Sequence, residues 1–264
     1  MGDGDIRITT HFYPDDLLTG LSGTIHECGH GMYEQGIPLD FAGTGAGEAA
    51  SMGLHESQSR FWENTIGRSR EFCGWLQGVL SRAWPDAAPS ADALYRGNNH
   101  VKPGLIRVYA DEVTYNLHIV ARFELERALF AGELEVRDLR DAWNAQYERL
   151  LGICPAHDTE GVLQDVHWSG GAFGYFPSYT LGNLYAASLG KAMQRDLPNM
   201  WSEVGRGEFT EVLAWLRDRV HRHAHVMDAP DIVRQACGET DSVEDLLDYL
   251  WARYGGLAGV SRPA

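Results

Sequence analysis

The apolar positions of residues 18–36 follow the period of an α-helix. Five of them recur at alternating intervals of three and four residues, namely Leu18, Leu21, Ile25, Cys28 and Met32. Side chains with this spacing share one face of a helix, which can pack against a core. Gly36 and Pro38 follow, and both residue types end helices. The pattern predicts an amphipathic helix that ends near residue 36.

Apolar stripes predict further helices along most of the chain. The stretch Glu48–Ile66 has a helical pattern and follows a flexible connector, Gly43–Gly47. Two stripes that end at Gly132 and Gly152 are separated by a short join, so they predict adjacent antiparallel helices. These stripes are Leu117, Ala121, Leu125 and Ala128, and then Val136, Leu139, Trp143, Tyr147 and Leu150. The remaining helical patterns cover residues 179–195, residues 209–225 and a segment from an N-cap at Ser242 to Tyr254.

The N-terminal segment Asp5–Thr10 has a different pattern, in which β-branched residues alternate with polar ones. This alternation predicts a short strand with one buried face. Two irregular stretches rich in glycine and aromatic residues, Asn98–Gly104 and His157–Pro177, interrupt the helices, and long irregular segments often carry function. The sequence thus predicts a mainly α fold with one or a few short strands.

The composition is that of a globular chain. With 264 residues and 44% hydrophobic residues it can form a sizeable core, and its length suits one large domain or two small ones. The 37 acidic residues outnumber the 22 basic ones, which gives a net charge of −15. This charge repels phosphate backbones and anionic lipids, so we expect no nucleic-acid partner and no membrane partner.

Three further features of the sequence bear on the cellular compartment of the protein. No apolar stretch reaches the roughly 18 to 20 residues that cross a bilayer. The N-terminus has no basic region followed by an apolar signal core. The four cysteines are widely spaced and form no CxxC pair. Together these features predict a cytoplasmic protein.

The sequence His26-Glu27-Cys28-Gly29-His30 is an HExxH motif inside the first predicted helix. Residues four apart lie on one helix face, so both imidazoles can hold one Zn²⁺ ion while Glu27 lies beside the open coordination position as a base. A catalytic zinc site needs a third protein ligand. The metzincin pattern is excluded, because it requires glycine and histidine where this chain has Tyr33 and Gly36.

A carboxylate on the next predicted helix is the expected third ligand. That helix follows a glycine-rich connector long enough to reverse the direction of the chain. It offers three candidates, Glu48, Glu56 and Glu63. Cys28 lies inside the motif but belongs to the apolar stripe, so we interpret it as a small core residue.

Five motifs follow one another along the chain: Asp5–Thr9 as DxRxT, His26–His30 as HExxH, His55–Arg60 as HES-QSR, Ile106–Asp111 as IRxxAD and Gly161–Trp168 as GxxQDxHW. In these motifs the chain resembles the carboxypeptidase Taq family of zinc metallocarboxypeptidases over essentially its whole length. The resemblance implies the helical fold of an HExxH zinc metallopeptidase with short strands at the active site. It also implies a single catalytic domain over residues 1–264, equivalent to the C-terminal half of the family, with the N-terminal half and its HPF motif absent.

The resemblance implies a metal centre. Its ligands would be His26, His30 and Glu56, with Glu48 as the second choice for the third ligand. The ion would be Zn²⁺, although Co²⁺ or another divalent ion is an alternative. Glu27 would be the general base that takes a proton from the zinc-bound water, whose pKa the zinc lowers to about 7.

The resemblance also implies residues that bind the substrate and its transition state. Donors for the oxyanion would be His167, Tyr175 and Tyr179, and we do not rank the two tyrosines. Arg107 would grip the terminal carboxylate, because a guanidinium fork matches two carboxylate oxygens. Its alternative role is a helical ion pair with Asp111, four residues on. Three further residues are interpreted as supporting ones: Gln164, Asp165 and Arg60.

Two other features have simpler interpretations. His221 and His225 could share a helix face as a second metal site, but a solvated polar face suits the alternating histidines better. Gly170–Gly174 is rich in glycine, but no strand precedes it and no Lys-Ser/Thr pair follows, so phosphate binding is not expected.

The predicted function is a zinc-dependent metallocarboxypeptidase that hydrolyses C-terminal residues from peptides with a free C-terminus. Retention of Glu27 favours catalysis, since a structural zinc site needs no base. The alternative is a truncated zinc-binding domain or subunit with little activity unless an N-terminal partner chain complements it. An endopeptidase is a third interpretation. The resemblance further implies a homodimer.

Overall fold

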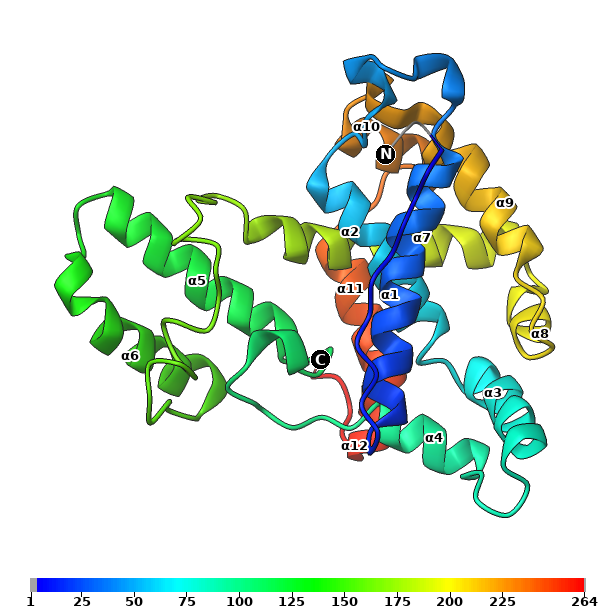
Figure 1. Cartoon of the computed structure of the whole chain (residues 1–264), viewed down its shortest axis with the longest axis horizontal. Helices are drawn as coiled ribbons and strands as arrows, with labels where there is room; N and C mark the ends of the chain where they lie inside the picture. Colours follow the sequence, from blue (N-terminus) through cyan, green and yellow to red (C-terminus); the bar gives the residue numbers. More distant parts are fainter. Residues whose placement is uncertain (1–3, 264) are drawn as a thin grey trace. The chain divides into compact units, whose positions relative to one another are not determined.

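The structure is a computed structural model that describes residues 4–263, and the chain divides into two compact units (Figure 1). The first unit comprises Met1–Asn98 and Leu181–Ala264, and the second comprises Asn99–Thr180. That residues 1–264 act as a single catalytic domain stays a prediction.

The first unit is built from helices around one apolar core. Its longer helices are α1 (Leu17–Gly36), α2 (Met52–Arg60), α3 (Arg70–Ala83), α4 (Ala91–Asn98), α9 (Thr210–Arg219), α10 (Ala229–Cys237), α11 (Ser242–Leu250) and, from Leu181 onward, α7 (Pro177–Asp196). Its shorter helices and turns are η1 (Leu39–Phe41), η2 (Gly45–Gly47), η3 (Phe61–Ile66), α8 (Met200–Val204), η6 (His221–Val226), η7 (Trp251–Gly255) and α12 (Gly256–Ala258). The centre of the core is fully buried and includes Leu54, Phe61, Leu189, Met193 and Leu216. Within the described chain, no helix combines the length and the hydropathy needed to span a membrane.

Two glycines allow other helices to contact α2 closely. A Cβ atom on Gly29 of α1 would overlap the backbone of α2. A Cβ atom on Gly182 of α7 would lie 2.5 Å from the Cγ atom of Glu56. Since neither position has room for a side chain, α2 is held between α1 and α7 at close range. This packing places the histidines of α1 beside Glu56.

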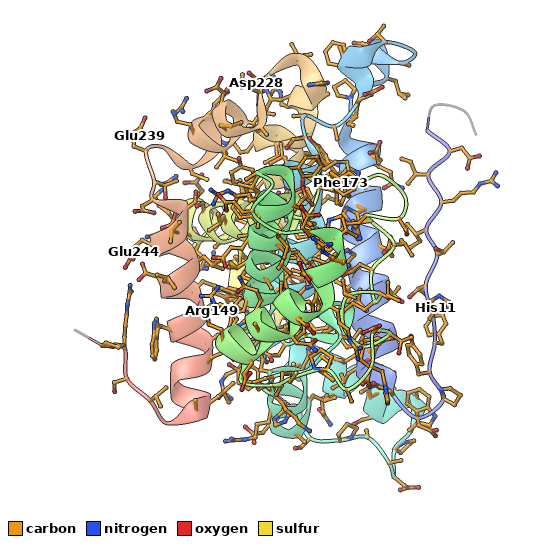
Figure 2. The ribbon with its side chains drawn as sticks, turned by 90° about the vertical axis from the view of Figure 1, so that its left-hand side faces the viewer. His11, Arg149, Phe173, Asp228, Glu239 and Glu244 are labelled. Atoms are coloured by element: carbon orange, nitrogen blue, oxygen red, sulfur yellow. The ribbon has the colours of Figure 1, made fainter. Side chains whose placement is uncertain are left out.

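The mainly α fold is confirmed, but the predicted strand at Asp5–Thr10 is wrong. Residues 4–263 contain no β-strand. The segment runs alongside α1, as both views of the chain show (Figure 1 and Figure 2, where His11 is labelled). Methyl carbons of Ile6 and Ile8 lie against Gly31 of α1. The alternating apolar residues therefore pack on a helix, and no second strand of the described chain pairs with this backbone.

Capping residues move two helix starts away from the predicted positions. Helix α2 begins at Met52 rather than at Glu48, because the side chain of Ser51 accepts a backbone N–H of the first turn. Helix α11 is capped in the same way by Asp241 rather than by Ser242. In each case the polar side chain satisfies a donor that the helix itself cannot pair.

The second unit contains a helical hairpin and a long irregular segment. Helices α5 (Tyr115–Phe130) and α6 (Leu139–Leu151) are the predicted adjacent pair, and the turn η5 (Val136–Asp138) leads into α6. Between them lies a small core of Ala121, Leu125, Trp143, Tyr147 and Leu151. At the surface, Arg149 of α6, which Figure 2 labels, binds the carboxylate of Glu124 on α5 at 2.6 Å. Helix α6 ends at Gly152 as predicted, where φ is 69°.

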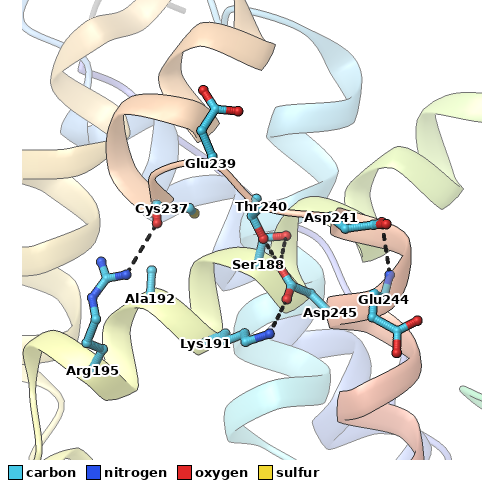
Figure 3. A pocket seen from close by; sticks show the side chains of 10 residues that line it. All are labelled: Ser188, Lys191, Ala192, Arg195, Cys237, Glu239, Thr240, Asp241, Glu244 and Asp245. Atoms are coloured by element: carbon cyan, nitrogen blue, oxygen red, sulfur yellow. Dashed lines mark hydrogen bonds and ion pairs between the residues drawn. The ribbon is translucent and has the colours of Figure 1, made fainter.

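A pocket of about 280 Å³ in the first unit lies where α7 meets the start of α11 (Figure 3). Asp245 is buried there and accepts hydrogen bonds from Ser188 at 2.8 Å, from Lys191 at 2.6 Å and from Thr240. Burial by itself raises the pKa of Asp245, but these donors lower it. Because Ser188 and Lys191 lie on α7 and Asp245 lies on α11, these hydrogen bonds link the two helices.

Candidate active site

The crossing of α1 and α2 brings both histidines of the HExxH motif against Glu56. The Nε2 atom of His30 lies 3.4 Å from Oε2 of Glu56, and the Nε2 atom of His26 lies 3.8 Å from the same oxygen. One ligand atom from each residue lies within 4.8 Å of the others. Among residues 4–263, this is the only group of three or more such side chains with that spacing.

These three donors fit a divalent ion of the zinc type. Catalytic zinc takes imidazole nitrogens and carboxylate oxygens at about 2.0–2.2 Å in tetrahedral geometry, which separates neighbouring donors by roughly 3.5 Å. The two separations from Oε2 of Glu56 lie close to this value. Mg²⁺ and Ca²⁺ prefer oxygen ligands, so the two imidazoles suit them less well. The role of these residues as ligands stays a prediction that this geometry supports.

Glu56 is only 6% exposed, and neighbouring groups balance its charge. Arg60 donates from Nε to Oε1 at 2.8 Å, and the Ser59 hydroxyl lies 3.3 Å from Oε2. Burial by itself raises the pKa of Glu56, but Arg60 and the two histidines lower it to about 2. The carboxylate is therefore ionised at neutral pH, as a metal ligand must be.

Glu63 lies on the outer side of His26. Its Oε2 accepts a hydrogen bond from Nδ1 of His26 at 2.8 Å and another from Arg60 at 3.2 Å. Burial by itself raises the pKa of Glu63, but Arg60 and His26 lower it well below its usual range. Of the three candidates for the third ligand, Glu63 is thus an outer partner and Glu48 is exposed outside the group. Only Glu56 faces both Nε2 atoms.

Glu27 follows His26 on α1 and is partly exposed. It forms no hydrogen bond or ion pair with any residue in the range 4–263. A carboxylate without such a partner keeps both oxygens available to accept a proton from water. The motif therefore carries, on the same helix as the two imidazoles, a carboxylate that has no such partner among residues 4–263.

Sequence reasoning missed two residues that extend this centre outward from His30. The Nδ1 atom of His30 lies 2.5 Å from Nδ1 of His55 on α2, and Nε2 of His55 lies 2.8 Å from Oε1 of Glu34. One signal was present in the sequence, because a spacing of four residues puts His30 and Glu34 on one face of α1. The contact with His55 arises only from the crossing with α2.

Arg107 lies in the second unit and is 6% exposed. Its Nη2 atom is 2.8 Å from Oδ1 of Asp165, and its Nη1 atom donates to the hydroxyl of Tyr115 at 3.1 Å. Arg122 binds the other oxygen of Asp165 at 2.7 Å. Burial by itself raises the pKa of Asp165, but the two arginines lower it. Two guanidinium groups share one carboxylate, so this set of three keeps one positive charge.

The alternative pairing of Arg107 with Asp111 is wrong. Arg107 begins a single 3₁₀ turn, η4 (Arg107–Tyr109), and residues four apart share a face only on an α-helix. Asp111 instead accepts the backbone N–H of Thr114 at 2.9 Å and so precedes α5 as a turn residue. Gln164 supports Arg107 directly, because its Oε1 accepts the backbone N–H of Arg107 at 2.9 Å.

The three predicted oxyanion donors come together in the second unit. Nε2 of His167 lies 3.0 Å from the hydroxyl of Tyr179, and the ring of Tyr175 lies 5.5 Å from each of the other two rings. The guanidinium of Arg107 covers the ring of Tyr179 at 4.7 Å. Burial and the charge of Arg107 lower the pKa of His167, so its imidazole is neutral at neutral pH. Their catalytic role stays a prediction.

The predicted solvated face is wrong for His221, and no second metal group forms in residues 4–263. Helix α9 ends at Arg219, and Ala224 has a φ of 45° that breaks the following turn, so His221 and His225 do not share a helix face. His221 is instead buried, with Nε2 at 2.9 Å from Oε1 of Gln58. Burial lowers the pKa of His221 to about 3.

Comparison with known proteins finds a matching family model and relatives that are named carboxypeptidases. The family model for carboxypeptidase Taq (M32) metallopeptidases matches residues 1–254. Carboxypeptidase 1 from Bacillus subtilis is 47% identical over 256 residues, which cover 96% of this chain and 51% of that protein. Thermostable carboxypeptidase 1 from Thermus thermophilus is 46% identical over 263 residues, which cover 98% of this chain and 51% of that protein.

The fold leads to the same group. The crystal structure of the M32 carboxypeptidase from Deinococcus radiodurans matches with a TM-score of 0.94 and 43% identity, over 98% of this chain and 53% of that one. The chain thus spans about half the length of the relatives it matches. The resemblance stated from the motifs is confirmed. The chain belongs to the carboxypeptidase Taq (M32) family of metallopeptidases.

Proposed function

We propose that this chain carries the catalytic centre of a zinc-dependent metallocarboxypeptidase, which removes residues from the free C-terminus of peptides. One observation carries the proposal: two imidazole nitrogens and one carboxylate oxygen lie within 4.8 Å of one another, and the helix of the two imidazoles also bears Glu27, which forms no hydrogen bond or ion pair within residues 4–263. Membership of a metallopeptidase family and relatives named carboxypeptidases support the reaction class.

Glu27 is the proposed general base. A divalent ion held by His26, His30 and Glu56 would supply the Lewis acidity that polarises water and the scissile carbonyl. Glu27 takes one proton from the attacking water as the water oxygen bonds to the carbonyl carbon. It then passes that proton to the amide nitrogen as the C–N bond breaks. The products are the shortened peptide and one free amino acid.

The proposed substrate contacts are the residues that the family resemblance implies. Negative charge develops on the carbonyl oxygen, and the imidazole and phenol groups of His167, Tyr175 and Tyr179 are suited to donate hydrogen bonds to it. Arg107 is the proposed contact for the terminal carboxylate. The positive charge that remains after Arg107 shares Asp165 with a second arginine supports that role.

Zinc is the proposed ion because the donor set combines two imidazoles with one carboxylate. Co²⁺ accepts the same ligands and is a suitable replacement in experiments. The proposed partners are peptides, and a homodimer is a further proposal. A second candidate function is a zinc-binding subunit that is weakly active until an N-terminal chain complements it. The relatives are about twice as long as this chain, and this difference in length supports the second candidate function.

The test uses one peptide with a free C-terminus and its C-terminal amide. Each is incubated with the zinc-loaded protein, and the products are identified by mass spectrometry. We expect trimming of the free peptide alone, because amidation removes the charge that a guanidinium recognises. Equal cleavage of both peptides at internal bonds would make the protein an endopeptidase. Zinc binding without any cleavage would favour the subunit, and turnover should then rise when the N-terminal half of a relative is added.

A further inference from the structure

The two histidines of the metal centre are held differently on their outer sides. Nδ1 of His26 meets a carboxylate directly, that of Glu63, whose side chain is only 11% exposed. Nδ1 of His30 meets a second imidazole, that of His55, and His55 in turn meets Glu34, whose side chain is 41% exposed. The second arrangement is therefore a hydrogen-bonded series of three side chains, His30, His55 and Glu34, whose last member is partly exposed to solvent.

Glu34, the last member of this hydrogen-bonded series, determines which nitrogen of each imidazole carries a hydrogen. The hydrogen bond with His55 lowers the pKa of Glu34, so at neutral pH Glu34 is a carboxylate that can only accept. The hydrogen between them must therefore sit on Nε2 of His55. A contact of 2.5 Å between two nitrogens has room for one hydrogen only, and an imidazole that carries its N–H on Nε2 offers Nδ1 as an acceptor.

The position of the hydrogen on His55 also determines the tautomer of His30, the proposed metal ligand. Because Nδ1 of His55 accepts, the hydrogen in the 2.5 Å contact belongs to Nδ1 of His30. The lone pair of His30 is then on Nε2. That atom is the one that faces Glu56 at 3.4 Å.

We propose that Glu34 is a positioning residue for the metal centre: acting through His55, it holds His30 as the Nδ1–H tautomer and presents the Nε2 lone pair to the ion. The proposal rests on the proposed function, because it takes His26, His30 and Glu56 as the ligands. It assigns a role in metal binding to a partly exposed side chain that touches no ligand. Groups of this kind commonly change metal affinity by about 10- to 100-fold when removed.

The decisive variant is Glu34→Gln. An amide can donate as well as accept, so its NH₂ group can bond to Nε2 of His55 and move the hydrogen of His55 to Nδ1. Two N–H groups cannot face each other at 2.5 Å, so His30 must then place its hydrogen on Nε2 and lose the ligand lone pair. The Zn²⁺ affinity, measured by competition with a chromophoric chelator, should fall by about 10- to 100-fold. The matched control is Glu48→Gln, which alters an exposed carboxylate outside the centre and should leave the affinity unchanged.

A second readout separates this role from a general effect on the fold. Two-bond ¹H–¹⁵N spectra of the metal-free protein report the tautomer of each histidine. We expect His30 to be Nδ1–H in the starting protein and to shift towards Nε2–H in Glu34→Gln, while His26 keeps its tautomer because Glu63 is intact. Glu34→Asp keeps a group that only accepts, so it should keep the tautomer of His30 and lose less affinity than Glu34→Gln.

The proposal requires both the loss of affinity and the change of tautomer. Either change without the other, or neither, would overturn it. Failure of the starting protein to bind Zn²⁺ would instead contradict the proposed function, and the tautomer spectra would still decide whether Glu34 acts through His55. Thermal melting of each metal-free variant checks that the fold is intact.

Discussion

A Cβ atom on Gly29 would lie 2.6 Å from the Cα atom of Ser59. Cβ atoms do not approach a backbone atom this closely, so any larger residue at position 29 must move α1 away from α2. The histidines lie on α1 and Glu56 lies on α2. The separation of the proposed metal ligands therefore depends on the absence of one methyl group at position 29.

Gly29→Ala should thus weaken Zn²⁺ binding by roughly tenfold or more and destabilise the protein by about 1–3 kcal/mol. Urea unfolding and zinc titration measure the two effects. Gly74→Ala on α3 is the control, because a Cβ atom there meets nothing within 4 Å and alanine favours a helix. If both variants behaved alike, the close crossing would not determine the geometry of the centre.

Glu27→Gln should keep the metal and abolish most hydrolysis. The change removes the base and leaves all three proposed ligands, so turnover should fall by about 10²- to 10⁴-fold at unchanged Zn²⁺ content. Metal analysis and peptide turnover are measured on the same sample. Retention of activity would assign the proton transfer to another group.

Glu56→Ala should release the ion, whereas Glu48→Ala should not. Glu56 faces both Nε2 atoms, and Glu48 is exposed outside the group. Equilibrium dialysis followed by metal analysis gives the zinc content. Added Zn²⁺ should also raise the melting temperature of the Glu48 variant and not that of the Glu56 variant, since only a bound ligand stabilises the fold. Equal loss in both variants would show that the third ligand is wrong.

Arg107→Lys should reduce the preference for a free C-terminus. Lysine keeps the charge beside Asp165 but lacks the planar fork that pairs with two carboxylate oxygens. The ratio of kcat/KM for a free peptide and its amide should therefore fall, while Arg137→Lys, an exposed arginine of the same unit, leaves it unchanged. An unaltered ratio in the Arg107 variant would reduce Arg107 to a partner of Asp165.

Acid should destabilise the fold partly through His221. Its pKa falls from about 6.5 to about 3 in the folded state, so below pH 6.5 the unfolded chain binds a proton that the folded chain does not. Stability from this residue is present above that pH and decreases as the pH falls towards 3. Urea midpoints of the metal-free protein should drop on acidification, and they should drop less in His221→Gln. Parallel curves for the two proteins would contradict the assignment.

Periodicity in the sequence predicts the helices best where one face is buried along the whole element. The stripe from Leu18 to Met32 predicts α1, and the two later stripes predict the α5 and α6 hairpin. The strand prediction fails because alternation identifies the side of Asp5–Thr10 that is covered but not what covers it. The start of α2 was missed because it depends on which of several polar residues caps the first turn.

In the candidate site too, features set by neighbouring residues could be predicted, whereas contacts between residues far apart in the sequence could not. The proposed ligands could be named because their motifs are short and keep their spacing on a helix. The partner of Arg107 could not, since Asp165 lies 58 residues further along the chain. The link from His30 to His55 likewise spans 25 residues and exists only through the crossing of α1 with α2.

The division of the chain into two units also determines the order in which those units can fold during translation. The second unit is one uninterrupted stretch, so its helical hairpin can form as soon as that stretch leaves the ribosome. The first unit cannot close, because its core includes Met193, Leu216 and Ile232 from the late part of the chain. Helix α1, although synthesised before those residues, therefore remains with its apolar stripe uncovered until they are made. Insertion of the metal must accordingly be among the last steps in the maturation of the protein.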